Sequence, residues 1–126
     1  MKIIRAAHLG MCFGVRDAIA LAVEEAKTTP LTILGQLVHN DTVLGSLRER
    51  GIQIEPTLDR VATSTVMVTA HGASERAKQS IRDRGFTMVE ATCPLVHLAH
   101  RELTTLVQKG HLVAVLLRQI HVQQQL

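Results

Sequence analysis

The stretch "TVMVTAHGASERAKQSIRDRG", residues 65–85, contains one complete strand, loop and helix. Its first six residues form a short run of β-branched and apolar side chains, which is typical of a buried strand. The letters "HGAS" then predict a loop, and residues 75–84 predict a helix. Gly85 favours the end of this helix, because glycine readily takes the left-handed conformation found just after helices. This unit decides the fold if it recurs along the chain.

The same order does recur on both sides of this unit. Further strands are predicted at residues 2–6, 31–35, 86–91 and 111–117, and further helices from Val15 toward Pro30, at 41–50 and at 95–109. The residues between Gly51 and the strand at 65–70 are expected to form a polar connection that includes Pro56. Alternating strands and helices predict an α/β fold with right-handed crossovers and a mainly parallel sheet.

The composition favours one small domain with an aliphatic core. The chain has 126 residues and contains no Trp or Tyr, so Ala, Val, Leu and Ile must fill the core. Its net charge of +3 is spread along the sequence without interleaved aromatic residues, which argues against nucleic-acid binding. The aliphatic run at 112–117 is too short to span a bilayer, and "MKIIRAAHLG" lacks the apolar length of a signal peptide. We therefore expect a cytoplasmic protein with no membrane partner.

Four residues suited to chemistry each follow one of the first four predicted strands. They are Cys12, His39, His71 and Cys93. The carboxyl ends of parallel strands lie at one edge of a sheet, and open α/β sheets bind ligands there. We therefore expect these four side chains to gather at that edge.

Both cysteines are predicted to lie at helix N-termini. Cys12 precedes the helix that starts near Val15, and Cys93 precedes Pro94, a residue favoured at the first helical position. A helix N-terminus favours the thiolate, the form that binds a metal or attacks a substrate. In a reducing compartment two cysteines are more typical of thiols, ligands or nucleophiles than of a disulfide. The alternative is that each cysteine is a small buried apolar residue.

Both histidines lie in loops that suit a phosphate group. His39 and His71 each precede a predicted helix start, at Asn40 or Asp41 and at Ser74. Backbone N–H groups at helix N-termini and a histidine that can carry charge together form a plausible phosphate or diphosphate cradle. The alternative is that these histidines are ordinary polar surface residues.

The residues alone leave the identity of a metal open. Two thiolates and two imidazoles can hold a tetrahedral zinc, but structural zinc ligands usually come in close pairs such as C-x-x-C. An iron–sulfur cluster accepts distant ligands, but it normally needs more than two cysteines. His97 and His100, three residues apart on a predicted helix, are a weaker candidate metal pair.

The motifs "GMCFGV", "GQLVHN", "TAHGAS" and "ATCPLV", in this order, resemble the N-terminal part of the 4-hydroxy-3-methylbut-2-enyl diphosphate reductases, over about residues 1–117. The resemblance implies a reductive dehydroxylation at a [4Fe-4S] cluster, which gives isopentenyl and dimethylallyl diphosphate in non-mevalonate isoprenoid biosynthesis. Ferredoxin or flavodoxin would supply the electrons. The cluster would lie among three similar α/β units, each giving one cysteine, with one iron open to the substrate hydroxyl.

The resemblance also implies roles for individual residues. Cys12 and Cys93 look like the first two cluster ligands, and His39 and His71 look like two of the residues that hold the diphosphate. The flanking glycines of "GMCFGV" would then give the cluster room beside Cys12. We expect residues 1–93 to form the first α/β unit and residues 94–126 to begin a second, incomplete one.

The match ends after about Leu117. The family continues with a Gly-His-Pro-Glu motif whose His binds diphosphate and whose Glu delivers a proton, whereas this chain reads "LRQIHVQQQL". His121 could replace that His, but Gln123 would stand for the Glu, and Gln cannot donate the proton at a useful rate. The third cysteine is absent. We therefore expect a truncated or frame-altered reductase; the alternatives are a non-catalytic α/β module that binds a diphosphate or a metal, and an inert remnant.

Overall fold

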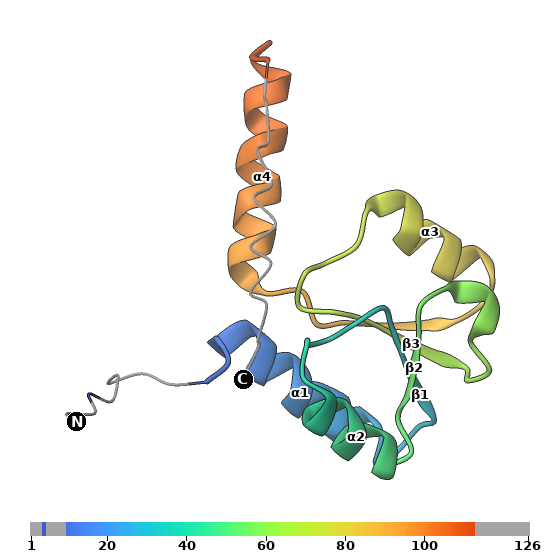
Figure 1. Cartoon of the computed structure of the whole chain (residues 1–126). Coiled ribbons are helices and arrows are strands. Elements are labelled where there is room, and N and C mark those ends of the chain that lie inside the picture. The colour runs from blue at the N-terminus through green and yellow to red at the C-terminus, as the bar shows by residue number, and fades with distance from the viewer. Residues whose placement is uncertain (1–3, 5–9, 113–126) are drawn as a thin grey trace.

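The computed structural model describes residue 4 and residues 10–112 (Figure 1). Its elements in chain order are α1 (Phe13–Glu25), β1 (Leu31–Leu34), α2 (Asp41–Glu49), β2 (Gln53–Glu55), a 3-10 helix (Leu58–Arg60), β3 (Thr65–Val68), α3 (Glu75–Asp83), β4 (Thr87–Glu90) and α4 (Pro94–Gln108). The strands predicted at 2–6 and 111–117 fall almost wholly outside the described residues, as do His121 and Gln123.

The four strands form one parallel sheet in the order β2-β1-β3-β4. The central strands β1 and β3 pair in register from Leu31 opposite Thr65 to Leu34 opposite Val68. Parallel neighbours need crossover connections, and the helices supply them. The predicted α/β class with a mainly parallel sheet is therefore confirmed.

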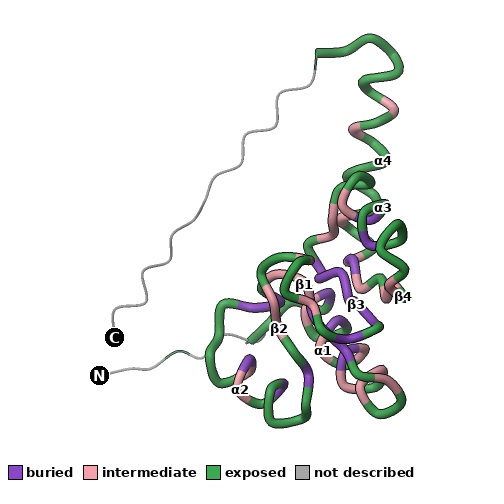
Figure 2. The backbone as a smooth tube through the Cα atoms, turned by 90° about the vertical axis from the view of Figure 1, so that its right-hand side faces the viewer, coloured by how far each residue is buried: buried purple, intermediate pink, exposed green. Residues whose placement is uncertain are grey.

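Helices cover both faces of the sheet (Figure 1). Strand β3 is buried along its whole length, and its side chains alternate between the two faces, as the pleat of a strand requires. Met67 belongs to the core cluster shared with α1 and α2, while Val66 and Val68 pack with Ile81 of α3. Figure 2 shows the buried residues concentrated along the strands and the inner sides of these helices.

The prediction of a polar connection without a strand between Gly51 and β3 is wrong. Residues 53–55 form β2, which pairs with β1 at the edge of the sheet. Ile52, only 1% exposed, anchors the start of this strand in the core. This stretch contains no apolar run, because an edge strand of three residues needs few apolar side chains and two of the three residues in β2 are polar.

Helix α1 is also shorter than the predicted run toward Pro30, since it ends at Glu25. The hydroxyls of Thr28 and Thr29 both donate to the Glu25 carbonyl, and the backbone N–H of Thr28 donates to the same oxygen. These bonds satisfy the orphan carbonyl at the helix end and close the chain into a turn.

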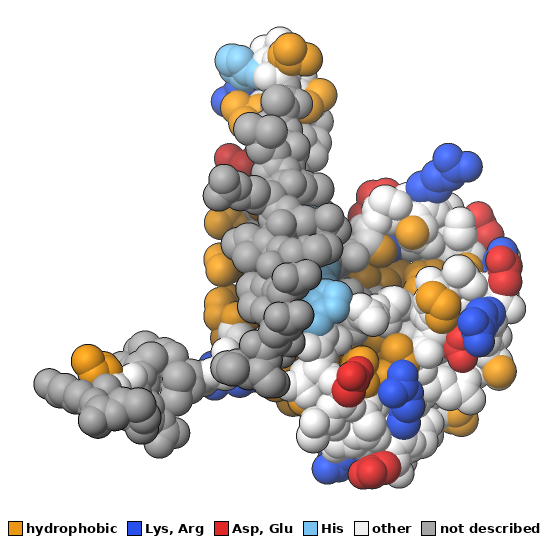
Figure 3. Space-filling model, viewed as in Figure 1, with side chains coloured by type: hydrophobic (Ala, Val, Ile, Leu, Met, Phe, Trp, Pro, Cys, Tyr) orange, Lys and Arg blue, Asp and Glu red, His pale blue; other side chains and the backbone are white. Residues whose placement is uncertain are grey.

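Helix α4 projects away from the sheet (Figure 1), and none of its residues is buried. Its apolar side chains include Leu95 and Val107, which are 59% and 60% exposed. Figure 3 shows hydrophobic side chains along one edge of this helix. Among the described residues, no helix is both long and apolar enough to cross a membrane.

Candidate functional site

Three of the four residues singled out from the sequence lie in loops that leave the same edge of the sheet. His39 follows β1, His71 follows β3 and Cys93 follows β4, and these three strands are parallel neighbours. The loop before His39 is fixed by Leu37 and Val38, which are buried. Both histidine residues are exposed, so their imidazoles are available to a ligand.

The Cys93 loop is tied directly to the His71 loop. The backbone N–H of Cys93 donates to the carbonyl of Ala70, the residue before His71, at 3.0 Å. Cys93 is the N-cap of α4, and Pro94 begins that helix as the sequence predicts. This bond fixes where the half-buried Cys93 leaves the sheet.

Cys12 reaches the same region through Gly14. Cys12 is the exposed N-cap of α1, and Gly14 is buried in the first turn of that helix. A Cβ placed on Gly14 would lie 2.7 Å from the Cys93 Sγ and 2.8 Å from the Cys93 Cβ, closer than real Cβ contacts allow. The bare backbone at Gly14 therefore admits the side chain of the other cysteine, while Gly10, with φ of 98°, makes the turn before Cys12.

A small cavity lies beside this contact. It has a volume of about 220 Å³, and α1 and the end of β4 line it, together with Thr92, Cys93 and Pro94. A larger apolar groove of about 510 Å³ lies between α1 and α2, but no His, Cys or acidic side chain lines it. Of these two cavities, the small one is therefore the one that a thiol lines, namely that of Cys93.

The four helix N-termini at this site fall into two kinds. Asn40 caps α2 by accepting from the Val43 N–H at 3.1 Å, and Ser74 caps α3 by accepting from the Ala77 N–H at 3.2 Å. Neither Cys12 nor Cys93 forms such a side-chain cap within the part of the chain that the structure describes. The helices that begin with a thiol thus leave their first N–H groups without a side-chain cap.

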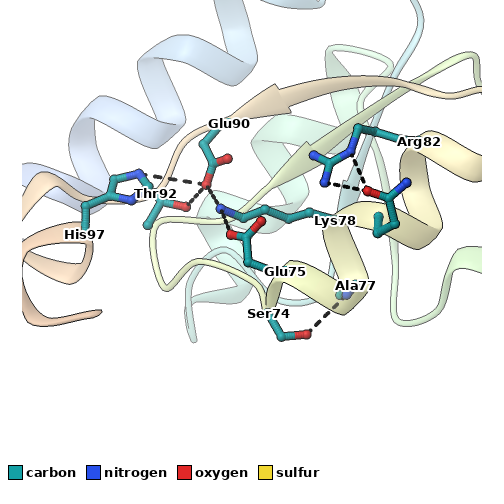
Figure 4. Close-up of polar contacts among 9 residues, drawn as sticks. Ser74, Glu75, Ala77, Lys78, Arg82, Glu90, Thr92 and His97 are labelled. Carbon is teal, nitrogen blue, oxygen red and sulfur yellow. Dashed lines mark hydrogen bonds and ion pairs between the residues drawn. The ribbon is translucent and has the colours of Figure 1, made fainter. Parts of the chain in front are cut away.

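A polar network behind Cys93 escaped the sequence analysis (Figure 4). The ammonium of Lys78, on α3, lies 2.8 Å from Glu90 Oε1 and 3.3 Å from Glu75 Oε1. The Thr92 hydroxyl donates to the same Glu90 oxygen, and His97 Nε2 lies 3.8 Å from it. The sequence pattern of an amphipathic helix predicts an exposed lysine, so only the structure reveals that Lys78 is buried.

Both charges of the central ion pair are stabilised. The hydrogen bond to Glu90 raises the pKa of Lys78 above its usual value, against the opposing effect of burial. Burial pushes the pKa of Glu90 upward, but the hydrogen bonds from Lys78 and Thr92 and the nearby positive charge outweigh it and leave this pKa lowered. The pair is therefore fully ionised at neutral pH.

The donor atoms fit part of a soft-metal ligand set. Both thiols are free, and no group of three or more His, Cys, Asp or Glu side chains converges within residues 10–112. His97 lies next to Glu90, so the weaker pairing with His100 receives no support. Two free thiols at the N-termini of α1 and α4, whose first turns meet where Gly14 lies against Cys93, suit a centre whose remaining ligands come from elsewhere.

Known proteins match the chain over most of its length. The profile of the LytB protein family matches residues 3–124. The 4-hydroxy-3-methylbut-2-enyl diphosphate reductase of Brevibacillus brevis is 36% identical over 121 residues, which are 88% of this chain and 39% of that protein. The reductase of Bacillus cytotoxicus is 38% identical over 79% of this chain and 35% of its own.

Solved structures of the same enzyme share the fold. A structure of (E)-4-hydroxy-3-methyl-but-2-enyl diphosphate reductase, described as the terminal enzyme of the non-mevalonate pathway, superimposes with a TM-score of 0.79 and 30% identity, over 94% of this chain and 43% of that one. The structure of the reductase from Plasmodium falciparum superimposes with a TM-score of 0.72 and 29% sequence identity, over 81% of this chain and 33% of that one. The chain spans about two fifths of the curated relatives it matches. With its cysteine-bearing helix N-termini and parallel sheet, this chain belongs to the LytB protein family.

Proposed function

We propose that this chain supplies the first α/β unit of a 4-hydroxy-3-methylbut-2-enyl diphosphate reductase. The observation that carries the proposal is the contact of Gly14 with Cys93, which brings the N-termini of α1 and α4 together. Each of these helices begins at a free thiol, and the His71 loop is bonded to the Cys93 loop. Residues 1–93 form this unit and residues 94–126 begin a second, a division supported by the absence of buried residues in α4.

Cys12 and Cys93 are the residues that would hold a [4Fe-4S] cluster. Cluster iron prefers thiolate ligands, and both cysteines are free and lie at the N-caps of helices. When bound, the cluster supplies electrons and a Lewis-acidic iron for the loss of the substrate hydroxyl. The further thiol ligands of a complete centre come from outside residues 10–112, because this range contains only two cysteines.

The substrate diphosphate would bind at the exposed histidines. His39 and His71 present imidazoles at one sheet edge, and protonated imidazoles bind phosphate oxygens. His121 is a third candidate that lies outside the described residues. Ferredoxin or flavodoxin is the electron donor in this proposal.

Anaerobic reconstitution of the full chain with iron and sulfide tests the cluster assignment. We expect iron and a cluster EPR signal after reduction in the wild type, and loss of both in Cys12→Ser and in Cys93→Ser. His100→Gln, on the exposed face of α4, is the matched control and should retain the cluster. Retention of the same iron by the double cysteine variant would refute the assignment.

Inorganic diphosphate binding, measured by calorimetry, tests the histidines separately. We expect His39→Gln and His71→Gln to weaken binding, and His100→Gln to leave it unchanged. Diphosphate binding by a chain that takes up no iron would instead indicate a non-catalytic binding module.

A further inference from the structure

Lys78 is an unusual residue for its position. Only 8% of it is exposed, although it lies on a helix whose other charged side chains face solvent. Charged side chains are almost never buried unless they are paired, and its close partner is Glu90, at 2.8 Å (Figure 4). The pair is only partly buried, since 31% of the Glu90 side chain is exposed. Such a pair contributes little net stability, because desolvation of Lys78 and screening by water at Glu90 both offset the attraction. Stability alone therefore does not explain the pair.

The pair continues into Thr92, the residue before Cys93. The Thr92 hydroxyl donates to Glu90 Oε1, the same oxygen that forms the ion pair with the Lys78 ammonium. At its other end, the Thr92 methyl lies 3.1 Å from the position that a Cβ on Gly72 would take. Thr92 is only 9% exposed, so its side chain is fixed between β4 and the loop that contains His71 and Gly72.

We propose that Lys78 and Glu90 are positioning residues that set the place of the Cys93 thiol through Thr92. The network joins three elements, because Lys78 comes from α3, Glu90 ends β4 and His97 lies in the first turn of α4. It holds Cys93 against Gly14 and beside the His71 loop. A role of this network in placing Cys93 for a cluster and a diphosphate rests on the proposed function. The positioning of Cys93 by Lys78 and Glu90 does not depend on it.

Alkylation of the two cysteines in the iron-free full chain tests the proposal. Iodoacetamide labelling followed by peptide mass spectrometry gives the rate at Cys93 relative to Cys12 in the same molecule. In Lys78→Met we expect this ratio to rise on the order of tenfold, because losing the network releases Cys93 locally. Lys78→Arg should restore the ratio. The control Lys27→Met removes the exposed ion pair with Glu24 and should leave the labelling ratio unchanged.

A general loss of stability would also raise the ratio, because Cys12 is already exposed whereas Cys93 is half-buried. The free energy of unfolding of each variant is therefore measured by circular dichroism in urea, and positioning requires a rise in the ratio larger than the fall in that free energy accounts for. An unchanged ratio in Lys78→Met, or an equal rise in Lys27→Met, would overturn the proposal. If Lys78→Met does not fold, Glu90→Gln gives the same test, because it keeps an oxygen for Thr92 while removing the charge. If the wild type takes up no iron, the proposed function fails, but the alkylation ratio still decides whether Lys78 positions Cys93.

Discussion

Replacing Gly14 by Ala tests the contact on which the site depends. In most helices this change stabilises by about 1 kcal/mol, because alanine has the higher helix propensity. At Gly14 the new methyl would lie 2.7 Å from Cys93 Sγ and 2.8 Å from Cys93 Cβ. Such overpacking costs about 1–3 kcal/mol, so Gly14→Ala should range from neutral to destabilising by about 2 kcal/mol.

The chain offers a matched control in Gly45→Ala. Gly45 lies inside α2, and nothing stands within 4 Å of its added Cβ. This variant should therefore gain up to about 1 kcal/mol from propensity alone. The two substitutions are chemically identical, so the difference between them isolates the Cys93 contact at about 1–3 kcal/mol.

Urea and thermal unfolding followed by circular dichroism measure this difference, since the chain has no Trp or Tyr for fluorescence. A gap of 1 kcal/mol corresponds to about 4 °C in Tm for a domain of about 100 residues. Equal stabilisation by Gly14→Ala and Gly45→Ala would show that the first turn of α1 does not lie against Cys93, and that the N-termini of α1 and α4 do not meet.

Three further predictions concern polar contacts. Folding lowers the pKa of Glu90 from its usual 4.5, so the wild type should be more stable than Glu90→Gln above pH 4.5 and lose this advantage as pH falls through the lower folded-state value; urea unfolding at pH 7 and pH 3 checks this. Asn40→Ala removes the cap of α2 and should destabilise by about 1 kcal/mol in urea unfolding, whereas Asn40→Gly should cost only a few tenths. Thr63→Val removes the buried hydroxyl that bonds Thr32 at 2.7 Å, and its Tm should fall by the equivalent of about 1–3 kcal/mol.

The sequence was sufficient to predict the fold, because glycines clearly mark where the helices end. Gly51 and Gly85 end helices with φ of 80° and 78°, as predicted, and the apolar runs at 31–35 and 65–70 form the central strands β1 and β3. Strand β2 could not be predicted, because Gln53 and Glu55 face partly outward at a sheet edge and give no apolar run.

The site was predictable only in outline. Topology alone places His39, His71 and Cys93 at one edge, because parallel strands end together. The nearness of Gly14 to Cys93 and the burial of Lys78 depend on how α1 and α3 pack against the end of β4. No local pattern encodes such packing between elements far apart in sequence.

The contact between Gly14 and Cys93 also fixes an order of events in time. It joins the first described helix to the start of the last, so the four strands of the described sheet all lie within the segment of chain that this contact closes. Long-range contacts of this kind form late, because loop closure must come first. In the proposed function, cluster loading would therefore follow folding of this unit, because Cys12 and Cys93 lie near opposite ends of the chain segment that must fold first.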